Sequence, residues 1–114
     1  MSEKRYQIFA TTYDKRGRIL AGATNDYKKS HPLQRQLSIQ VYGHPEKMYL
    51  HAELAACLRS GDKEIHRIVV QRFDSQGRPA LAKPCMMCMK ALELYGVKFL
   101  WYTNEYQQIT KEKL

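Results

Sequence analysis

The sequence predicts an α/β domain in which helices cover a mixed β-sheet, and two features support this prediction. Two strand-like segments near the beginning are joined by a short turn, which favours an antiparallel hairpin. Further along, helical and strand-like segments alternate. A strand, a helix and a second strand in succession favour a parallel pair joined by a right-handed crossover. The predicted order is strand, strand, helix, strand, helix, strand.

The first third of the chain contains the predicted hairpin and then a long connection. Residues 6–13 are rich in aromatic and β-branched residues, which indicates a strand, and 18–23 form its antiparallel partner. The turn at 14–17 ends with Gly17, which can adopt a positive φ. Residues 25–48 are polar and contain two His-Pro pairs, which break regular structure. We expect this segment to be a long ordered loop that contacts the substrate.

Two short helices are predicted in the remainder of the chain. Residues 51–60 have Ala and Leu on most sides, so we expect a largely buried helix that ends at Gly61. Pro84 can begin a second helix without losing a hydrogen bond, and Gly96 ends that helix after about residue 95. Both helices should therefore begin next to residues that carry chemistry.

Two strands alternate with these helices. Residues 64–73 contain the apolar run Ile68-Val69-Val70 and indicate a strand, followed by a turn at 74–79. Residues 97–103 are almost continuously apolar, which is typical of a strand buried on both faces. Residues 107–114 have no clear pattern, and we expect a ragged or weakly helical tail.

Length and composition limit the class of protein. A chain of 114 residues is expected to form one domain, 1–114, with a relatively short C-terminal part. No apolar run approaches the ~20 residues that cross a bilayer, so we expect no membrane span. The first residues lack the apolar region of a signal peptide, and the three cysteines are an odd number. Both features predict a cytoplasmic protein in a reducing compartment.

The chain is basic, with 19 Lys and Arg against 11 Asp and Glu, a formal charge of +8. Such a charge attracts polyanions and phosphorylated small molecules. The charge is distributed over both halves of the chain, and many soluble proteins without an anionic partner reach it, so it favours no single partner.

Candidate metal ligands stand at the starts of both predicted helices. Cys85 and Cys88 are three residues apart, so on a helix they share one face and can bind one ion. The positive end of the helix dipole lowers the pKa of thiols in the first turn. With His51 at the start of the other helix, they form a set of three ligands that leaves a fourth position open, the pattern of catalytic zinc. The alternatives are a structural zinc site, with a fourth ligand from Cys57 or another histidine, and a redox pair of cysteines.

Glu53, two residues after His51, is the candidate catalytic residue. A carboxylate beside zinc can move protons instead of binding the metal. Read alone, a glutamate in the first turn of a helix most often interacts with the helix dipole.

The pattern His51-Ala52-Glu53 with Pro84-Cys85 and Cys88 resembles the cytidine deaminase superfamily. From Gly17 to Tyr106 the chain is most similar to the deoxycytidylate deaminase branch, and the further matching residues are Gly17-Arg18-Ile19-Leu20, Gly22, Asn25, Gly96-Val97-Lys98 and Trp101-Tyr102. The resemblance implies a three-layer fold with a zinc site at two helix N-termini. It also implies hydrolytic loss of ammonia from a cytosine ring, and often a homo-oligomer.

The resemblance also implies roles for individual residues. His51, Cys85 and Cys88 would bind zinc, and Glu53 would transfer protons. Asn25 would bind the sugar or the edge of the base, and the backbone around Ala52 would contact the pyrimidine. The expected substrate is a free cytosine nucleotide or nucleoside, with deoxycytidylate the leading candidate. The alternatives are cytosine in single-stranded DNA or RNA, adenosine in tRNA, and a non-catalytic zinc module.

Overall fold

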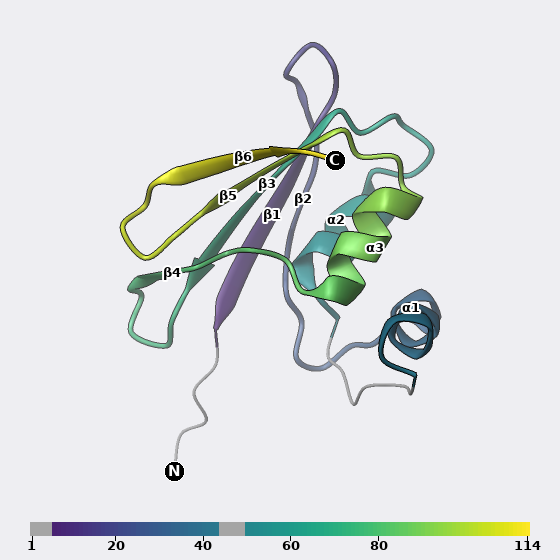
Figure 1. The fold of residues 1–114 in the computed structure, drawn as a ribbon, viewed down its shortest axis with the longest axis horizontal. Helices are drawn as coiled ribbons and strands as arrows, with labels where there is room; N and C mark the ends of the chain where they lie inside the picture. Colours follow the sequence, from purple (N-terminus) through teal and green to yellow (C-terminus); the bar gives the residue numbers. More distant parts are fainter. Residues whose placement is uncertain (1–5, 44–49) are drawn as a thin grey trace.

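The structure is a computed structural model that describes residues 6–43 and 50–114. Figure 1 shows a twisted sheet with the helices gathered on one side of it. The elements in chain order are β1 (Gln7–Tyr13), β2 (Ile19–Thr24), α1 (Pro32–Tyr42), α2 (Ala52–Arg59), β3 (Arg67–Phe73), β4 (Pro79–Ala80), α3 (Met86–Leu94), β5 (Phe99–Thr103) and β6 (Ile109–Lys113).

The sheet is mixed, as predicted. Its strand order is β2-β1-β3-β5-β6, and the short strand β4 pairs with β3. The pairs β1–β2, β1–β3 and β5–β6 are antiparallel, whereas β3 and β5, on either side of α3 in the chain, are parallel. This parallel pair is the one that the predicted strand–helix–strand unit requires.

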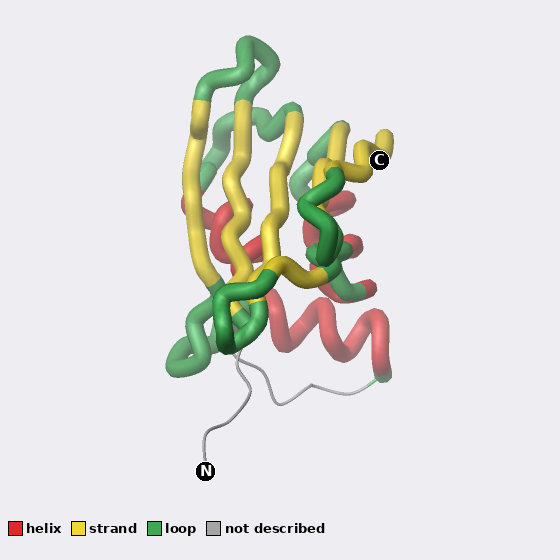
Figure 2. The backbone as a smooth tube through the Cα atoms, turned by 90° about the vertical axis from the view of Figure 1, so that its left-hand side faces the viewer, coloured by secondary structure: helices red, strands yellow, loops and turns green. Residues whose placement is uncertain are grey.

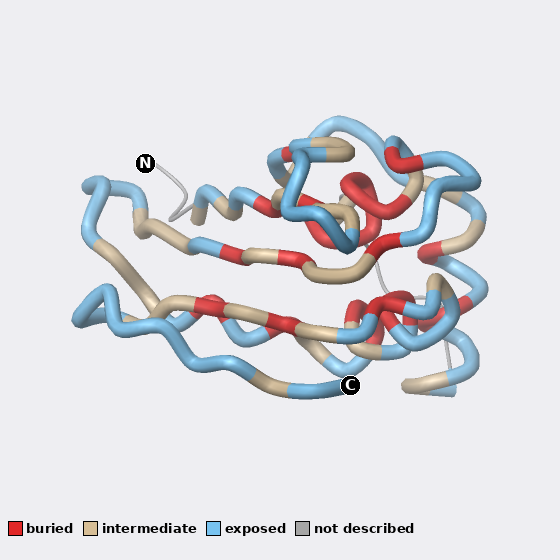
Figure 3. The backbone as a smooth tube through the Cα atoms, turned by 90° about the horizontal axis from the view of Figure 1, so that it is seen from above, coloured by how far each residue is buried: buried red, intermediate tan, exposed pale blue. Residues whose placement is uncertain are grey.

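The core lies between the sheet and the pair α2 and α3. Alternate strand residues face the helices and are fully buried, among them Ile68, Val70 and Leu100. In Figure 3 the buried positions alternate with less buried ones along the strands and concentrate in the helices. The opposite face of the sheet carries no helix in the described part of the chain, as Figure 2 shows. The prediction that residues 97–103 are buried on both faces was therefore wrong, since Phe99 and Trp101 remain partly exposed on the open side.

The prediction that residues 25–48 form a loop was also wrong, because they contain α1. His31 caps this helix by accepting a hydrogen bond from the Leu33 N–H at 3.1 Å, and Pro32 occupies its first position. Gly43 ends it with a φ of 81°. Leu37 of α1 packs in one buried cluster with Leu54, Met87 and Ala91 of the other two helices. All three helices lie on the same side of the sheet, as Figure 1 shows.

The prediction of a ragged tail at 107–114 was wrong as well, because Ile109–Lys113 form the edge strand β6. The turn before it, 104–108, repeats the hydrogen-bond pattern of the turns 14–18 and 74–78. In each, the Oδ1 atom of the first residue accepts backbone N–H groups two and four residues later. Gly17 and Gly77 take the positive φ that this turn needs, whereas the third turn uses Gln107, at 59°.

Among the helices that the structure describes, none is both long and apolar enough to cross a membrane.

Candidate active site

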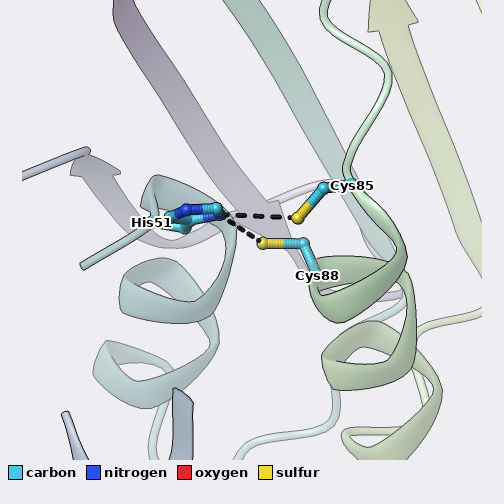
Figure 4. Close-up of side chains that lie close together, drawn as sticks. All are labelled: His51, Cys85 and Cys88. Carbon is cyan, nitrogen blue, oxygen red and sulfur yellow. Dashed lines mark hydrogen bonds between the residues drawn. The ribbon is translucent and has the colours of Figure 1, made fainter. Parts of the chain in front are cut away.

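His51 and Cys85 occupy equivalent places, because each is the residue that immediately precedes a helix. His51 is the N-cap of α2 and Cys85 is the N-cap of α3, both with extended backbone. Neither side chain caps its own helix. Cys88 lies within the first turn of α3, and Figure 4 shows all three side chains pointing toward one another. The sequence analysis predicted that these residues stand at helix starts. The packing of α2 beside α3 brings the two starts together.

The donor atoms lie close enough together for one metal ion to bind all three. The His51 Nδ1 atom lies 3.2 Å from the Cys88 Sγ atom and 3.6 Å from the Cys85 Sγ atom. All three donors lie within 4.8 Å of one another, so the group could hold a metal ion. Zinc bonds of about 2.3 Å to sulfur and about 2.0–2.1 Å to nitrogen place such ligands about 3.6 Å apart in a tetrahedron. One imidazole and two thiolates are ligands that zinc prefers, and they are near enough to one another to share one ion.

In residues 6–43 and 50–114, no fourth His, Cys, Asp or Glu joins this group of donors. Cys57 is fully buried in the core, and burial raises the pKa of its thiol to about 12, so it stays protonated. His31 caps α1 and His66 packs against the ring of Phe99. His44 lies outside the described residues. Three protein ligands with an open position is the arrangement of catalytic zinc sites, whereas structural sites have four.

The two thiols have opposite electrostatic environments. A hydrogen bond from Cys88 lowers the pKa of Cys85 to about 4, and His51 contributes in the same direction. The pKa of Cys88 is raised, first by the neighbouring Cys85 and then by burial. One thiol of the pair is thus already favoured as thiolate. A divalent cation would favour the thiolate form of both.

Helix α1 supports this group through a residue that the sequence analysis missed. The His51 N–H donates a 2.9 Å hydrogen bond to the Oε1 atom of Gln34, whose side chain is 1% exposed. Nearby, the Ser38 hydroxyl lies 3.0 Å from the Met87 sulfur. Both contacts join α1 to the helices that carry the candidate ligands. The Pro32 and Gly43 signals could have predicted α1, but no local pattern marks Gln34 as the residue that contacts His51.

Glu53 is buried beside the candidate ligands. Its residue is 4% exposed, and its Oε1 atom has no hydrogen-bond partner in the described part of the chain. Burial is the main cause of the raised pKa of its carboxyl. An unpartnered buried carboxylate oxygen is costly in a protein interior, so its presence here indicates a functional group.

Ala52 and Asn25, the predicted substrate contacts, lie in different settings. Ala52 is the fully buried first residue of α2, where backbone N–H groups have no partner within the helix. Asn25 follows β2 and holds the start of β1: its Oδ1 accepts from the Ile8 N–H at 3.0 Å, and its Nδ2 donates to the Tyr6 carbonyl at 2.9 Å. The structure thus gives Asn25 a structural role, and its substrate contact stays a prediction.

Comparison with known proteins places the fold. No protein-family profile and no curated protein sequence matches the chain. The structure is similar to that of a mutant cytidine deaminase from Mycobacterium tuberculosis, with a TM-score of 0.52 and 18% sequence identity, covering 96% of this chain and 73% of that one. The chain has a cytidine deaminase fold. The predicted fold class is confirmed, and the closer resemblance to the deoxycytidylate branch stays a prediction.

Proposed function

We propose that this protein is a zinc-dependent hydrolytic deaminase that converts a cytosine ring to uracil and releases ammonia. One observation carries the proposal: the buried Glu53 carboxylate, with an unpartnered oxygen, lies two residues from the histidine of a His/Cys/Cys group at facing helix starts. The deaminase fold supports the same conclusion.

The overall reaction replaces the C4–NH₂ group of the ring with a C4 carbonyl, using one water and releasing one ammonia. His51, Cys85 and Cys88 would hold the metal. When bound, zinc would supply a Lewis acid that makes water nucleophilic at neutral pH. Glu53 would accept a proton from the attacking water and deliver it to ring N3. It would then transfer the second water proton to the amine as the C4–N bond breaks.

The substrate-binding roles follow from the start of α2. The Ala52 N–H, at the first position of α2, has no acceptor within the helix and is a donor that the edge of a pyrimidine can use. The Asn25 side chain uses one acceptor position and one N–H in its bonds to Ile8 and Tyr6. An amide oxygen can accept a second bond and an amide nitrogen can donate a second one, and through these Asn25 would contact the sugar or the edge of the base.

The preferred substrate is a free cytosine nucleotide or nucleoside, with deoxycytidylate first because of the sequence resemblance to that branch. The second candidate is cytosine in single-stranded DNA or RNA. The charge of +8 is compatible with either candidate, because it attracts both polyanions and phosphorylated small molecules. A homo-oligomer remains part of the proposal for either substrate.

The test is ammonia release by the zinc-loaded protein on cytidine, deoxycytidine, their monophosphates and single-stranded cytosine oligonucleotides, with the matching adenine compounds beside them. We expect turnover of one or more free cytosine compounds. Turnover of oligonucleotides alone would replace the first candidate with the second. Zinc-loaded protein that releases no ammonia from any of these compounds would contradict the proposed function.

A further inference from the structure

The helix-free face of the sheet carries a row of alternating rings and cations that the candidate active site does not use. The row crosses four strands: Tyr13 on β1, Arg67 on β3, Trp101 on β5 and Lys111 on β6. The Arg67 guanidinium lies 4.3 Å from the ring centres of both Tyr13 and Trp101. Lys111 Nζ lies 4.2 Å from the Trp101 ring centre. We call these four residues the sheet row.

Within residues 6–43 and 50–114, no carboxylate forms an ion pair with the cations of the sheet row. Among the described strand residues that face this side, Arg67, Lys111 and Lys113 are basic and none is acidic. Glu112 points to the other face, where the Tyr102 hydroxyl donates to it at 3.2 Å. The Arg67 Nε atom is buried and has no hydrogen-bond acceptor within the described residues. Lys111 and Lys113 are exposed, so these two cations are accessible to an anionic ligand.

A cavity adjoins the sheet row. Its volume is about 430 Å³, and it is lined by His66, Arg67, Phe99, Trp101, Lys111, Glu112 and Lys113. This size is in the range of sites that take a nucleotide-sized group. Phe99 and Trp101 are partly exposed, so part of each ring is accessible.

We propose that the sheet row is a binding surface for single-stranded nucleic acid. Surfaces of this kind combine cations that follow the phosphate backbone with aromatic side chains on which bases stack. Stacking between two rings fixes the orientation of the Arg67 guanidinium, so little side-chain entropy is lost when it binds a phosphate. An extended strand fits an open sheet face, whereas a duplex presents no unstacked bases to the rings.

This proposal does not rest on the proposed deaminase activity. The sheet row faces away from α2 and α3, whose N-termini carry His51 and Cys85. A protein without deaminase activity would still bind a strand here, and a deaminase specific for free nucleotides would do so too. The deaminase function and the binding surface can therefore each be disproved without affecting the other.

The experiment measures binding of a fluorescein-labelled oligothymidylate by anisotropy, together with the fluorescence of Trp101, the single tryptophan of the chain. Thymine keeps binding separate from deamination. The test variant is K111Q/K113Q, which removes two exposed lysines of this face. The matched control is K28Q/K29Q, which removes two exposed lysines elsewhere. Circular dichroism and zinc content check that each variant is folded.

We expect the oligonucleotide to quench Trp101 and the test variant to bind roughly tenfold more weakly near 0.1 M salt, with a salt slope lower by about 1.4. The control should change both quantities much less. Trp101→Leu should weaken binding roughly fivefold or more through lost stacking. Equal losses in the test and control variants, unchanged Trp101 fluorescence at saturation, or duplex DNA binding as tightly as the single strand would each overturn the proposal.

Discussion

The Gln34 side chain accepts a hydrogen bond from the backbone of His51 at 2.9 Å, across an interval of 17 residues. The bond fixes the residue that begins α2, and it comes from a helix that contributes no candidate ligand of its own. The position of the histidine in the candidate metal group is therefore set by α1 as well as by α2. This relationship gives the first prediction.

Gln34→Leu should lower the free energy of unfolding by about 1–3 kcal/mol, because a buried N–H group loses its acceptor. Zinc affinity should fall roughly 10- to 100-fold, as expected when the support of a ligand is removed. Denaturant unfolding and competition with a chelator measure the two effects. Gln36→Leu, at an exposed position of the same helix, is the control. Wild-type zinc affinity in a folded Gln34→Leu protein would contradict the supporting role of Gln34.

Glu53→Gln should keep zinc but lower kcat at least ~100-fold, since the amide cannot carry protons between water and the ring. Elemental analysis and ammonia release on the best cytosine compound give the two readouts. A metal-loaded variant with wild-type turnover would remove Glu53 from the mechanism.

Cys85→Ala and Cys88→Ala should each lose zinc and unfold at a lower temperature, because metal binding is coupled to folding. The control is Cys57→Ala, which removes a buried thiol that lies outside the donor group. This control should lose some stability through the cavity it creates and should still bind zinc. Zinc content equal to wild type in either ligand variant would show that the metal binds elsewhere.

Gln107→Gly should raise the free energy of unfolding by up to about 1 kcal/mol, because glycine adopts the positive φ of this position without strain. Glycine also loses more chain entropy on folding, which offsets part of the gain. The reverse change, Gly77→Gln, places a side chain in the equivalent turn and should be destabilising. Thermal unfolding of both variants compares the two turns, and a lower midpoint for Gln107→Gly would refute this account of the turn.

Local signals in the sequence predicted much of the fold. The hairpin, α2, β3, α3 and β5 all follow from turn residues, capping residues and apolar patterns. The segment 32–42 was missed because Pro32 was interpreted as a breaker, although proline is favoured at the first position of a helix. The strand β6 was missed because its turn has Gln107 in place of the glycine that marks the turns at 17 and 77.

The candidate site was also predictable only in part. The spacing of Cys85 and Cys88 on a predicted helix indicated a pair of ligands, and the resemblance to the cytidine deaminase superfamily joined His51 to them. The contact between Gln34 and His51, and the buried setting of the Glu53 oxygen, depend on how helices pack at long range. No local pattern determines such contacts.

Strand β6 also affects the tendency of the protein to aggregate in concentrated solution. It forms one border of the sheet, with β5 as its only strand neighbour in the described chain. An exposed edge strand can pair with strands of other molecules, which leads to aggregation. The consecutive charges of Lys111, Glu112 and Lys113 make such pairing unfavourable. Strand β6 therefore disfavours aggregation through the edge of the sheet.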